Sequence, residues 1–193
     1  MDHKNFSQTR RTIISAFTQW LLILLILLCS TSMAFSATAK EIDVSVEVTL
    51  ERFNKEIPGA ESFIKKAKGV LIFPQVIKVG FGIGGEYGEG ALRIGGKTVE
   101  YYSTMAASIG FQFGAQAKSI ILVFTKDDAL KAFRKNDGWK AGVDGSVALI
   151  SLGMGDSLDT TTVKDPIVAF VFGQKGLMYN LTIEGSKFNK LQR

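Results

Sequence analysis

Alternating glycines in the middle of the chain restrict its fold more than any other feature. The stretch VGFGIGGEYGEG, residues 79–90, places Gly80, Gly82 and Gly84 on one face of an extended strand, with large apolar residues between them. Glycines on one face of a strand allow a sheet to curve sharply, or another backbone to approach closely. We therefore expect tightly curved β-structure here.

The same stretch contains two motifs that resemble nucleotide-binding loops. Gly80, Gly82 and Gly85 match the dinucleotide pattern G-x-G-x-x-G, and residues 91–98 differ by one residue from a Walker A loop. Both loops need a helix directly after the glycines, so that a phosphate meets the helix N-terminus. Further glycines and strand-forming residues follow instead, so we expect that neither motif binds a nucleotide.

The chain after Val70 is typical of many short strands. Apolar residues recur with period two, and turn residues separate the segments at 95–96, 118–119 and 173–176. The expected strands are VLIFP, VGFGIGGEY, GALRI, TVEYYST, SIGFQFGAQA, SIILVF, GVDGSVALI, PIVAFVFG and GLMYNLTIEG. One helix interrupts them, from a capping pair at Thr125 and Asp128 to Gly138.

Two helices precede these strands. Residues 44–57 place Val46, Leu50, Phe53 and Ile57 on one helical face. Residues 60–68 form a second, shorter helix with lysines near its end and a glycine at position 69 as the C-cap. The whole pattern predicts an α+β fold: a predominantly antiparallel β barrel or sandwich with N-terminal helices and one inserted helix.

The N-terminal region has the layout of a secretory signal. Lys4, Arg10 and Arg11 precede an uncharged apolar run, WLLILLILLC, and small residues follow it. The run is shorter than the roughly 18–20 apolar residues of a spanning helix. Extended back to Ile13 it reaches borderline length, so a retained anchor stays open as an alternative. We predict a signal peptide at residues 1–37, one domain at residues 38–193, and export to the periplasm or cell envelope.

The predicted mature chain lacks the residues of several kinds of site. The only histidine is His3 and the only cysteine is Cys29, so cleavage near residue 37 removes both. Their loss excludes disulfides, Cys/His zinc sites, His-ligated haem and hydrolases with a histidine base. Removing the charged residues of the signal lowers the formal charge from +5 to +3, which suits an anionic membrane surface but not nucleic acid. We predict no enzyme activity, no catalytic residues, no metal and no cofactor.

Two pairs of acidic residues are candidates for a catalytic or a cation-binding site. Glu86 and Glu89 bracket a Tyr-Gly pair, and Asp156 and Asp159 lie in an expected loop. Paired carboxylates are used in glycoside hydrolysis, and loop carboxylates bind cations. Scattered acids on turns are more often solvated, and this is the interpretation we favour.

Several long blocks resemble the SYLF domain, also called the Ysc84 family, in its bacterial exported form. The blocks are AKGVLIFPQVIKVGFGIGGEYGEGALRIGGKTVEYYST, GAQAKSIILVF, GWKAGVDGSVAL and FVFGQKGLMYNLTIEGSK, and the resemblance covers nearly all of residues 45–190. Eukaryotic members of this family are phosphoinositide-binding modules with an amphipathic, basic N-terminal segment, and some bind actin. Bacterial members are described as lipid-binding. The resemblance therefore implies contact with lipid.

One cluster of residues fits this expectation. The candidate lipid-binding residues are Phe63, Ile64, Lys65, Lys66, Lys68 and Lys78. The lysines would contact lipid phosphates, and the two apolar side chains would enter the acyl boundary. The alternative is a helix packed on the core whose lysines are simply solvated.

The function expected from these observations is that of an exported, non-enzymatic protein that binds anionic phospholipid at a membrane surface. Neither nucleic acid nor nucleotide is expected as a partner. A second hypothesis is a β-barrel carrier that holds a small hydrophobic ligand in an internal cavity, because glycine-rich strand faces leave space inside a barrel.

Overall fold

Two very long strands dominate the structure, a computed structural model that describes residues 37–151, 164–175, 183 and 185–193, with backbone alone at 81–82 and 108–113. Strand β1 (Gly69–Ile94) and strand β2 (Lys97–Phe124) form one antiparallel hairpin. Its turn is made by Gly95 and Gly96, whose φ angles of 58° and 80° favour glycine. The predicted turn at this position is confirmed.

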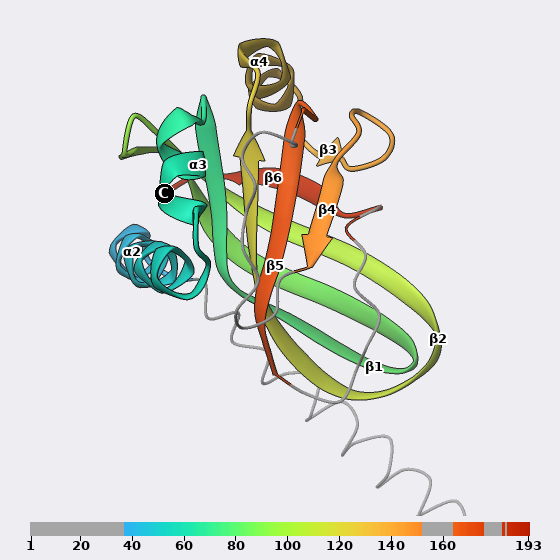
Figure 1. The fold of residues 1–193 in the computed structure, drawn as a ribbon. Coiled ribbons are helices and arrows are strands. Elements are labelled where there is room, and N and C mark those ends of the chain that lie inside the picture. Colours follow the sequence, from blue (N-terminus) through green and yellow to red (C-terminus); the bar gives the residue numbers. More distant parts are fainter. Residues whose placement is uncertain (1–36, 152–163, 176–182, 184) are drawn as a thin grey trace, which may run out of the picture. The chain divides into compact units, whose positions relative to one another are not determined.

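The hairpin is folded in half (Figure 1). Residues 69–81 of β1 pair with the second half of β2, whereas residues 83–94 pair with its first half. Around the bend, a Cβ on Gly80 would lie 3.0 Å from the Cα of Gly84. Where the two halves of β1 cross, a Cβ on Gly88 would lie 2.7 Å from the carbonyl oxygen of Gln75. The glycines thus permit sharp curvature and close backbone contact, as predicted, and the stretch is strand rather than a loop before a helix.

Within the described residues, four shorter strands join this hairpin in the sheet. They are β3 (Trp139–Lys140), β4 (Ala148–Ser151), β5 (Ile167–Lys175) and β6 (Lys187–Leu191). The strand order is β3-β6-β2-β5-β4, with β1 also paired to β2, and only β4 and β5 run parallel.

Three described helices pack on the sheet. Helix α2 (Ala39–Glu56) begins with a capping box between Thr38 and Glu41, and its buried face includes the predicted residues Val46 and Phe53. Helix α3 (Ala60–Lys66) follows Gly59, and helix α4 (Asp127–Lys135) joins β2 to β3. The α+β class, the N-terminal helices and the inserted helix are confirmed. Within the described residues, no helix is both long and apolar enough to cross a membrane.

The sheet separates two apolar cores. The inner face, enclosed by the folded hairpin, carries Leu71, Phe73 and Leu122 and packs against Phe133 of α4 and Phe188 of β6. The outer face carries another set that includes Ile72, Ile121 and Phe170, and it is covered by α2 and α3. Residues Ala37–Arg193 form one compact unit.

Several boundaries differ from the expected ones. The first six expected strands are continuous in β1 and β2, because glycines bend these strands without ending them. The 118–119 segment is a register irregularity within β2 rather than a turn. Gly69 begins β1 instead of capping α3, which has its C-cap at Ala67. The expected strand GLMYNLTIEG lies almost entirely outside the described residues.

The capping of α4 and the last strand were also predicted wrongly. Lys126 is the N-cap of α4, and the hydroxyl of Thr125 instead donates to the carbonyl oxygen of Asp165 at 2.7 Å. Strand β6 falls where no strand was expected. It alternates only weakly, and its formation depends on pairing with β2 and β3.

Candidate functional site

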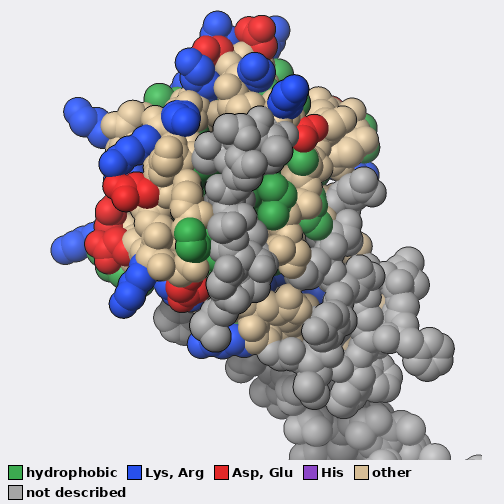
Figure 2. Space-filling view, viewed as in Figure 1, with side chains coloured by type: hydrophobic (Ala, Val, Ile, Leu, Met, Phe, Trp, Pro, Cys, Tyr) green, Lys and Arg blue, Asp and Glu red, His purple; other side chains and the backbone are tan. Residues whose placement is uncertain are grey.

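The predicted lysines at the end of helix α3 and just after it are exposed, and two of them lie beside acids. Lys65, Lys66 and Lys68 are all exposed. The ammonium of Lys65 lies 2.7 Å from the Glu61 carboxylate, and that of Lys68 lies 3.4 Å from Asp127. Figure 2 shows basic and acidic side chains mixed along the upper and left edges, where α3 and α4 lie. The local charge is therefore weaker than the run of lysines indicates.

The apolar residues of α3 belong to the core. Phe63 is 6% exposed, and its ring meets Phe170 edge-on with 5.5 Å between centroids. Ile64 is half-buried and packs against the same outer-face core. For Phe63 the placement matches the core-packed alternative, because a ring held there is not presented to a bilayer.

Ile64 and Lys65 do come together at a pocket of about 500 Å³ between α2, α3 and the β1–β2 turn. Arg93 also lines this pocket, and its guanidinium pairs with Glu47. With Glu61 beside Lys65, each of these two cations already has a carboxylate partner. The pocket is consequently close to neutral.

Lys78 is separated from the α3 lysines and buried. It is 2% exposed, and its ammonium lies 3.4 Å from one carboxylate oxygen of Glu86. The other oxygen of Glu86 is 2.9 Å from the ammonium of Lys118. An irregularity in β1 between Phe73 and Val76 changes which residues face inward, so Lys78 follows Val76 onto the inner face. The expectation that Lys78 joins a surface cluster was wrong for this reason.

The buried charges do not balance. Two lysines share one carboxylate, which leaves one positive charge in excess among these residues. Gln116 is the cross-strand partner of Lys78 and is 2% exposed, yet neither atom of its amide has a hydrogen-bond partner. Burying unpaired charge or unpaired amide groups costs free energy. We call Lys78, Glu86, Gln116 and Lys118 the inner charged cluster.

The acidic pairs do not form a catalytic arrangement in the described residues. Glu86 belongs to the inner charged cluster, whereas Glu89 accepts a hydrogen bond from the hydroxyl of Tyr87 at 2.6 Å. Burial, followed by the nearby Glu89 carboxylate, raises the pKa of Tyr87 to about 12. Asp156 and Asp159 lie outside the described residues.

The outer face of the bend is apolar and exposed. Five large side chains stand there, a set we call the outer strip: Ile77, Val79, Ile83, Tyr87 and Met105. Their exposed fractions range from 46% at Ile77 to 74% at Ile83. Exposed apolar side chains gathered on one face are candidates for a binding surface.

Exposed lysines border the outer strip on both sides. Ile77 pairs with Ala117, and Ala117 pairs with Lys175 of β5. On the other side, Met105 pairs with Lys187 of β6, which pairs with Lys140 of β3. Cross-strand partners lie on the same face of a sheet. The lysines therefore continue the surface of the strip.

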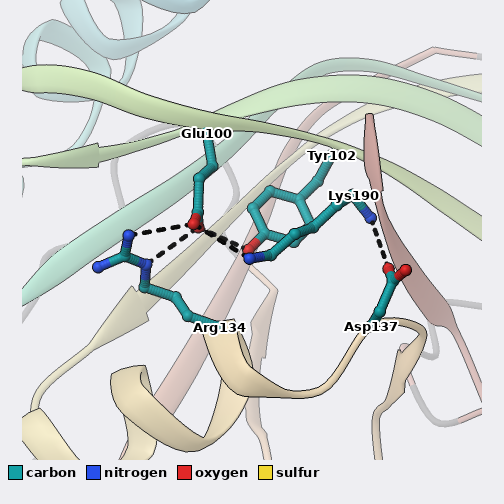
Figure 3. Close-up of polar contacts among 5 residues, drawn as sticks. All are labelled: Glu100, Tyr102, Arg134, Asp137 and Lys190. Carbon is teal, nitrogen blue, oxygen red and sulfur yellow. Dashed lines mark hydrogen bonds and ion pairs between the residues drawn. The ribbon is translucent and has the colours of Figure 1, made fainter. Parts of the chain in front are cut away.

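A separate polar network, drawn in Figure 3, fastens α4 and β6 to β2. The Glu100 carboxylate accepts two hydrogen bonds from Arg134, both 3.0 Å, one from the Tyr102 hydroxyl at 2.8 Å and one from Lys190 at 3.1 Å. Asp137 accepts from the backbone nitrogen of Lys190 at 3.2 Å. Burial alone would raise the pKa of Glu100, but these donors outweigh it and lower the pKa to about 2. With every carboxylate site occupied, this network is structural.

Part of the chain matches a known protein family. The family model described as Las17-binding protein actin regulator, Ysc84, matches residues 105–192. Residues 105–192 therefore belong to the Ysc84 family. The match runs from Met105 in β2 to the end of β6, and α2, α3 and β1 lie outside it. A comparison with curated proteins finds no match.

Sequence reasoning missed the inner charged cluster and the outer strip of this protein. Both depend on which residues of β1 face inward after the irregularity at 73–76. Pro74, within an otherwise continuous strand pattern, was the available signal, since proline in a strand marks bulges and edges.

Proposed function

We propose that the chain is an exported, non-enzymatic protein that binds anionic phospholipid at a membrane surface. The observation that carries the proposal is the outer strip, five exposed apolar side chains bordered by Lys175, Lys187 and Lys140. Apolar groups gain free energy by entering the acyl boundary, and each nearby lysine adds about 1 kcal/mol at an anionic surface.

The outer strip suits this role better than α3 does. Ile83 is 74% exposed, whereas Phe63 is 6% exposed and packed on Phe170. Membrane entry by Ile83 requires no rearrangement of the core, whereas entry by Phe63 would empty part of it. The α3 lysines then contribute long-range attraction.

Site-specific fluorescence tests which surface meets the bilayer. Cys29 is the only cysteine, so a Cys29→Ser background allows one label to be placed at Ile83→Cys. Val99→Cys is the matched control, because Val99 is 44% exposed on β2 near the opposite end of the hairpin. The label is an environment-sensitive fluorophore on the full chain. Vesicles of phosphatidylcholine with phosphatidylglycerol are compared with phosphatidylcholine alone.

We expect a blue shift at position 83, not at position 99, on anionic vesicles, and a smaller shift at high salt. The apolar N-terminal run should bind both vesicle types to the same extent. The difference in fluorescence shift between the two types therefore reports the charge-dependent contact. A label at position 83 that stays in water on anionic vesicles contradicts the outer-strip assignment. If the protein shows no preference for anionic vesicles at low salt, the proposed function itself is wrong.

A further inference from the structure

A pocket of about 330 Å³ lies at the edge of the outer strip, between α2 and strands β1, β2 and β5. Its lining is basic, hydroxylic and apolar. The residues whose side chains matter for its chemistry are Arg52, Lys175, Thr49, Val44 and Val48. None of the residues that line it within the described chain is acidic. Unlike the pocket beside α3, it has no carboxylate among its lining residues, and Glu56, the ion-pair partner of Arg52 at 3.8 Å, lies outside the lining.

Arg52 is held in place at this pocket. Its guanidinium donates a hydrogen bond to the Ser119 hydroxyl at 3.0 Å and lies 4.8 Å from the centroid of the Phe172 ring. The Ser119 hydroxyl in turn donates to the carbonyl oxygen of Pro74 at 2.8 Å. Gly173, at φ 63°, leaves the space that the guanidinium occupies, because a Cβ there would collide with it. A guanidinium fixed by neighbours loses little entropy when it binds an anion.

Arg52 also retains capacity to bind. Its Nε atom has no hydrogen-bond partner, and its ion pair with the half-exposed Glu56 carboxylate is long, at 3.8 Å. Lys175, at the rim, is exposed. A guanidinium and an ammonium at one pocket are the groups that proteins use to bind phosphate.

The inner charged cluster adds to this positive field. Lys118 lines the pocket, and its ammonium pairs with Glu86 on the inner face of the same sheet. Since two lysines there share one carboxylate, the sheet beneath the pocket carries excess positive charge. A cleft of one sign with apolar walls concentrates anions.

We propose that this pocket binds a phosphate group, with Arg52 and Lys175 as its direct contacts. The exposed side chains of Val44 and Val48, at 58% and 59%, would meet an apolar substituent on the phosphate. This inference deepens the proposed function, on which it rests for a lipid source, because it assigns headgroup recognition to α2 and β5 and leaves bilayer contact to the outer strip. The same chemistry also fits a free phosphate or a soluble phosphomonoester.

Calorimetric titration of the full chain without vesicles tests the pocket. The probes are inorganic phosphate, glycerol 3-phosphate and dihexanoyl phosphatidic acid below its micelle concentration, at constant ionic strength with acetate as the control anion. We expect Arg52→Gln to weaken phosphate-probe binding by about tenfold or more. Lys55→Gln, which removes the same charge from an exposed site on α2, should change it less than about twofold.

The three probes distinguish the source of the phosphate. Tighter binding of the short-chain lipid than of glycerol 3-phosphate, lost in Val48→Asn, assigns a lipid headgroup. Equal binding of all three assigns a free phosphate group. Lys175→Gln, at an exposed position, repeats the test should circular dichroism show that Arg52→Gln is unfolded. Absence of binding by every probe, or equal binding by the wild type and the folded variant, overturns the pocket assignment, whatever the vesicle experiment gives.

Discussion

The two ends of the folded hairpin have inner faces of opposite chemistry. Toward the start of β1 and the end of β2, Phe73 pairs with Ile120 and both are buried among apolar residues. Toward the bend, Lys78 pairs with Gln116, and both are equally buried among charges. The same strands and the same alternation therefore produce a packed core at one end and the inner charged cluster at the other.

The two ends differ in how much they contribute to the stability of the fold. Burial of apolar side chains stabilises the folded state at about 25 cal/mol per Å². A buried ion pair adds little compared with apolar residues of the same volume, because both charges lose their hydration. The apolar end therefore accounts for the fold, whereas the charged end contributes little to its stability.

The largest expected effect is at the apolar end. Phe133 is fully buried, and its ring lies 5.0–5.3 Å from those of Tyr102, Phe124 and Trp139. Phe133→Ala should lower the free energy of unfolding by about 3–5 kcal/mol, since the ring's contacts are lost and a cavity is left. Urea denaturation followed by circular dichroism measures this. Ile83→Ala, on the exposed outer strip, should change it by less than about 0.5 kcal/mol.

The next effect is at the charged end. Glu86→Gln removes the only carboxylate paired with Lys78 and Lys118 in the described structure and leaves both ammonium groups buried. The free energy of unfolding should fall by about 3 kcal/mol in the same assay. Replacing the ion pairs altogether, with Lys78→Met, Glu86→Leu and Lys118→Met in one protein, should restore wild-type stability or exceed it. A triple variant less stable than Glu86→Gln would show that the charged end does support the fold.

The next largest effect on stability is expected from substitutions where the two halves of β1 cross. A Cβ on Gly90 would collide with the backbone of Ile72, whereas one on Gly85 would meet only the Ala106 carbonyl oxygen at 3.8 Å. Gly90→Ala should therefore cost about 1–3 kcal/mol of unfolding free energy, and Gly85→Ala less than about 0.5 kcal/mol. Equal effects at the two positions would mean that the halves of β1 do not cross closely.

Much of this fold was predictable because local patterns decide it. The face of α2, the β-turn at Gly95 and Gly96 and the antiparallel sheet follow from spacing, glycine conformation and alternation. The lengths of β1 and β2 were not predictable, because turn-forming glycines inside a strand cannot be told from glycines at its end. Strand β6 forms only where partners from β2 and β3 meet it.

The candidate site was harder to predict, since it depends on contacts between distant residues. Phe63 is buried by Phe170, more than a hundred positions later in the chain. The inward orientation of Lys78 follows from one irregularity at 73–76, and such a shift moves every later side chain to the other face. No local sequence pattern identifies Arg52, because its guanidinium is positioned by Ser119 and Gly173, which are distant from it in the sequence.

The dependence of stability on acid pH tests the Glu100 network, in which, unlike in the inner charged cluster, the carboxylate is fully hydrogen-bonded. The pKa of Glu100 is about 2 in the folded protein and 4.5 ordinarily, so its stabilising effect is complete above pH 4.5 and is lost as the pH falls toward 2. Arg134→Gln removes its bidentate donor and should cost about 1 kcal/mol at neutral pH. The loss of stability between pH 4.5 and 3 should then become shallower in urea denaturation. An unchanged acid profile would contradict the assigned cause.

The smallest expected effect on the free energy of unfolding is at Gln116. Because neither atom of its buried amide has a hydrogen-bond partner, Gln116→Leu removes an unpaired polar group and keeps most of the side-chain volume. The free energy of unfolding should stay within about 1 kcal/mol of the wild type, on the side of higher stability. Gln75→Leu, at an exposed position of β1, is the control for the added apolar surface. A clear loss at Gln116 alone would mean that its amide is paired in solution, and the charged end would then resemble the Glu100 network more than an unbalanced cluster.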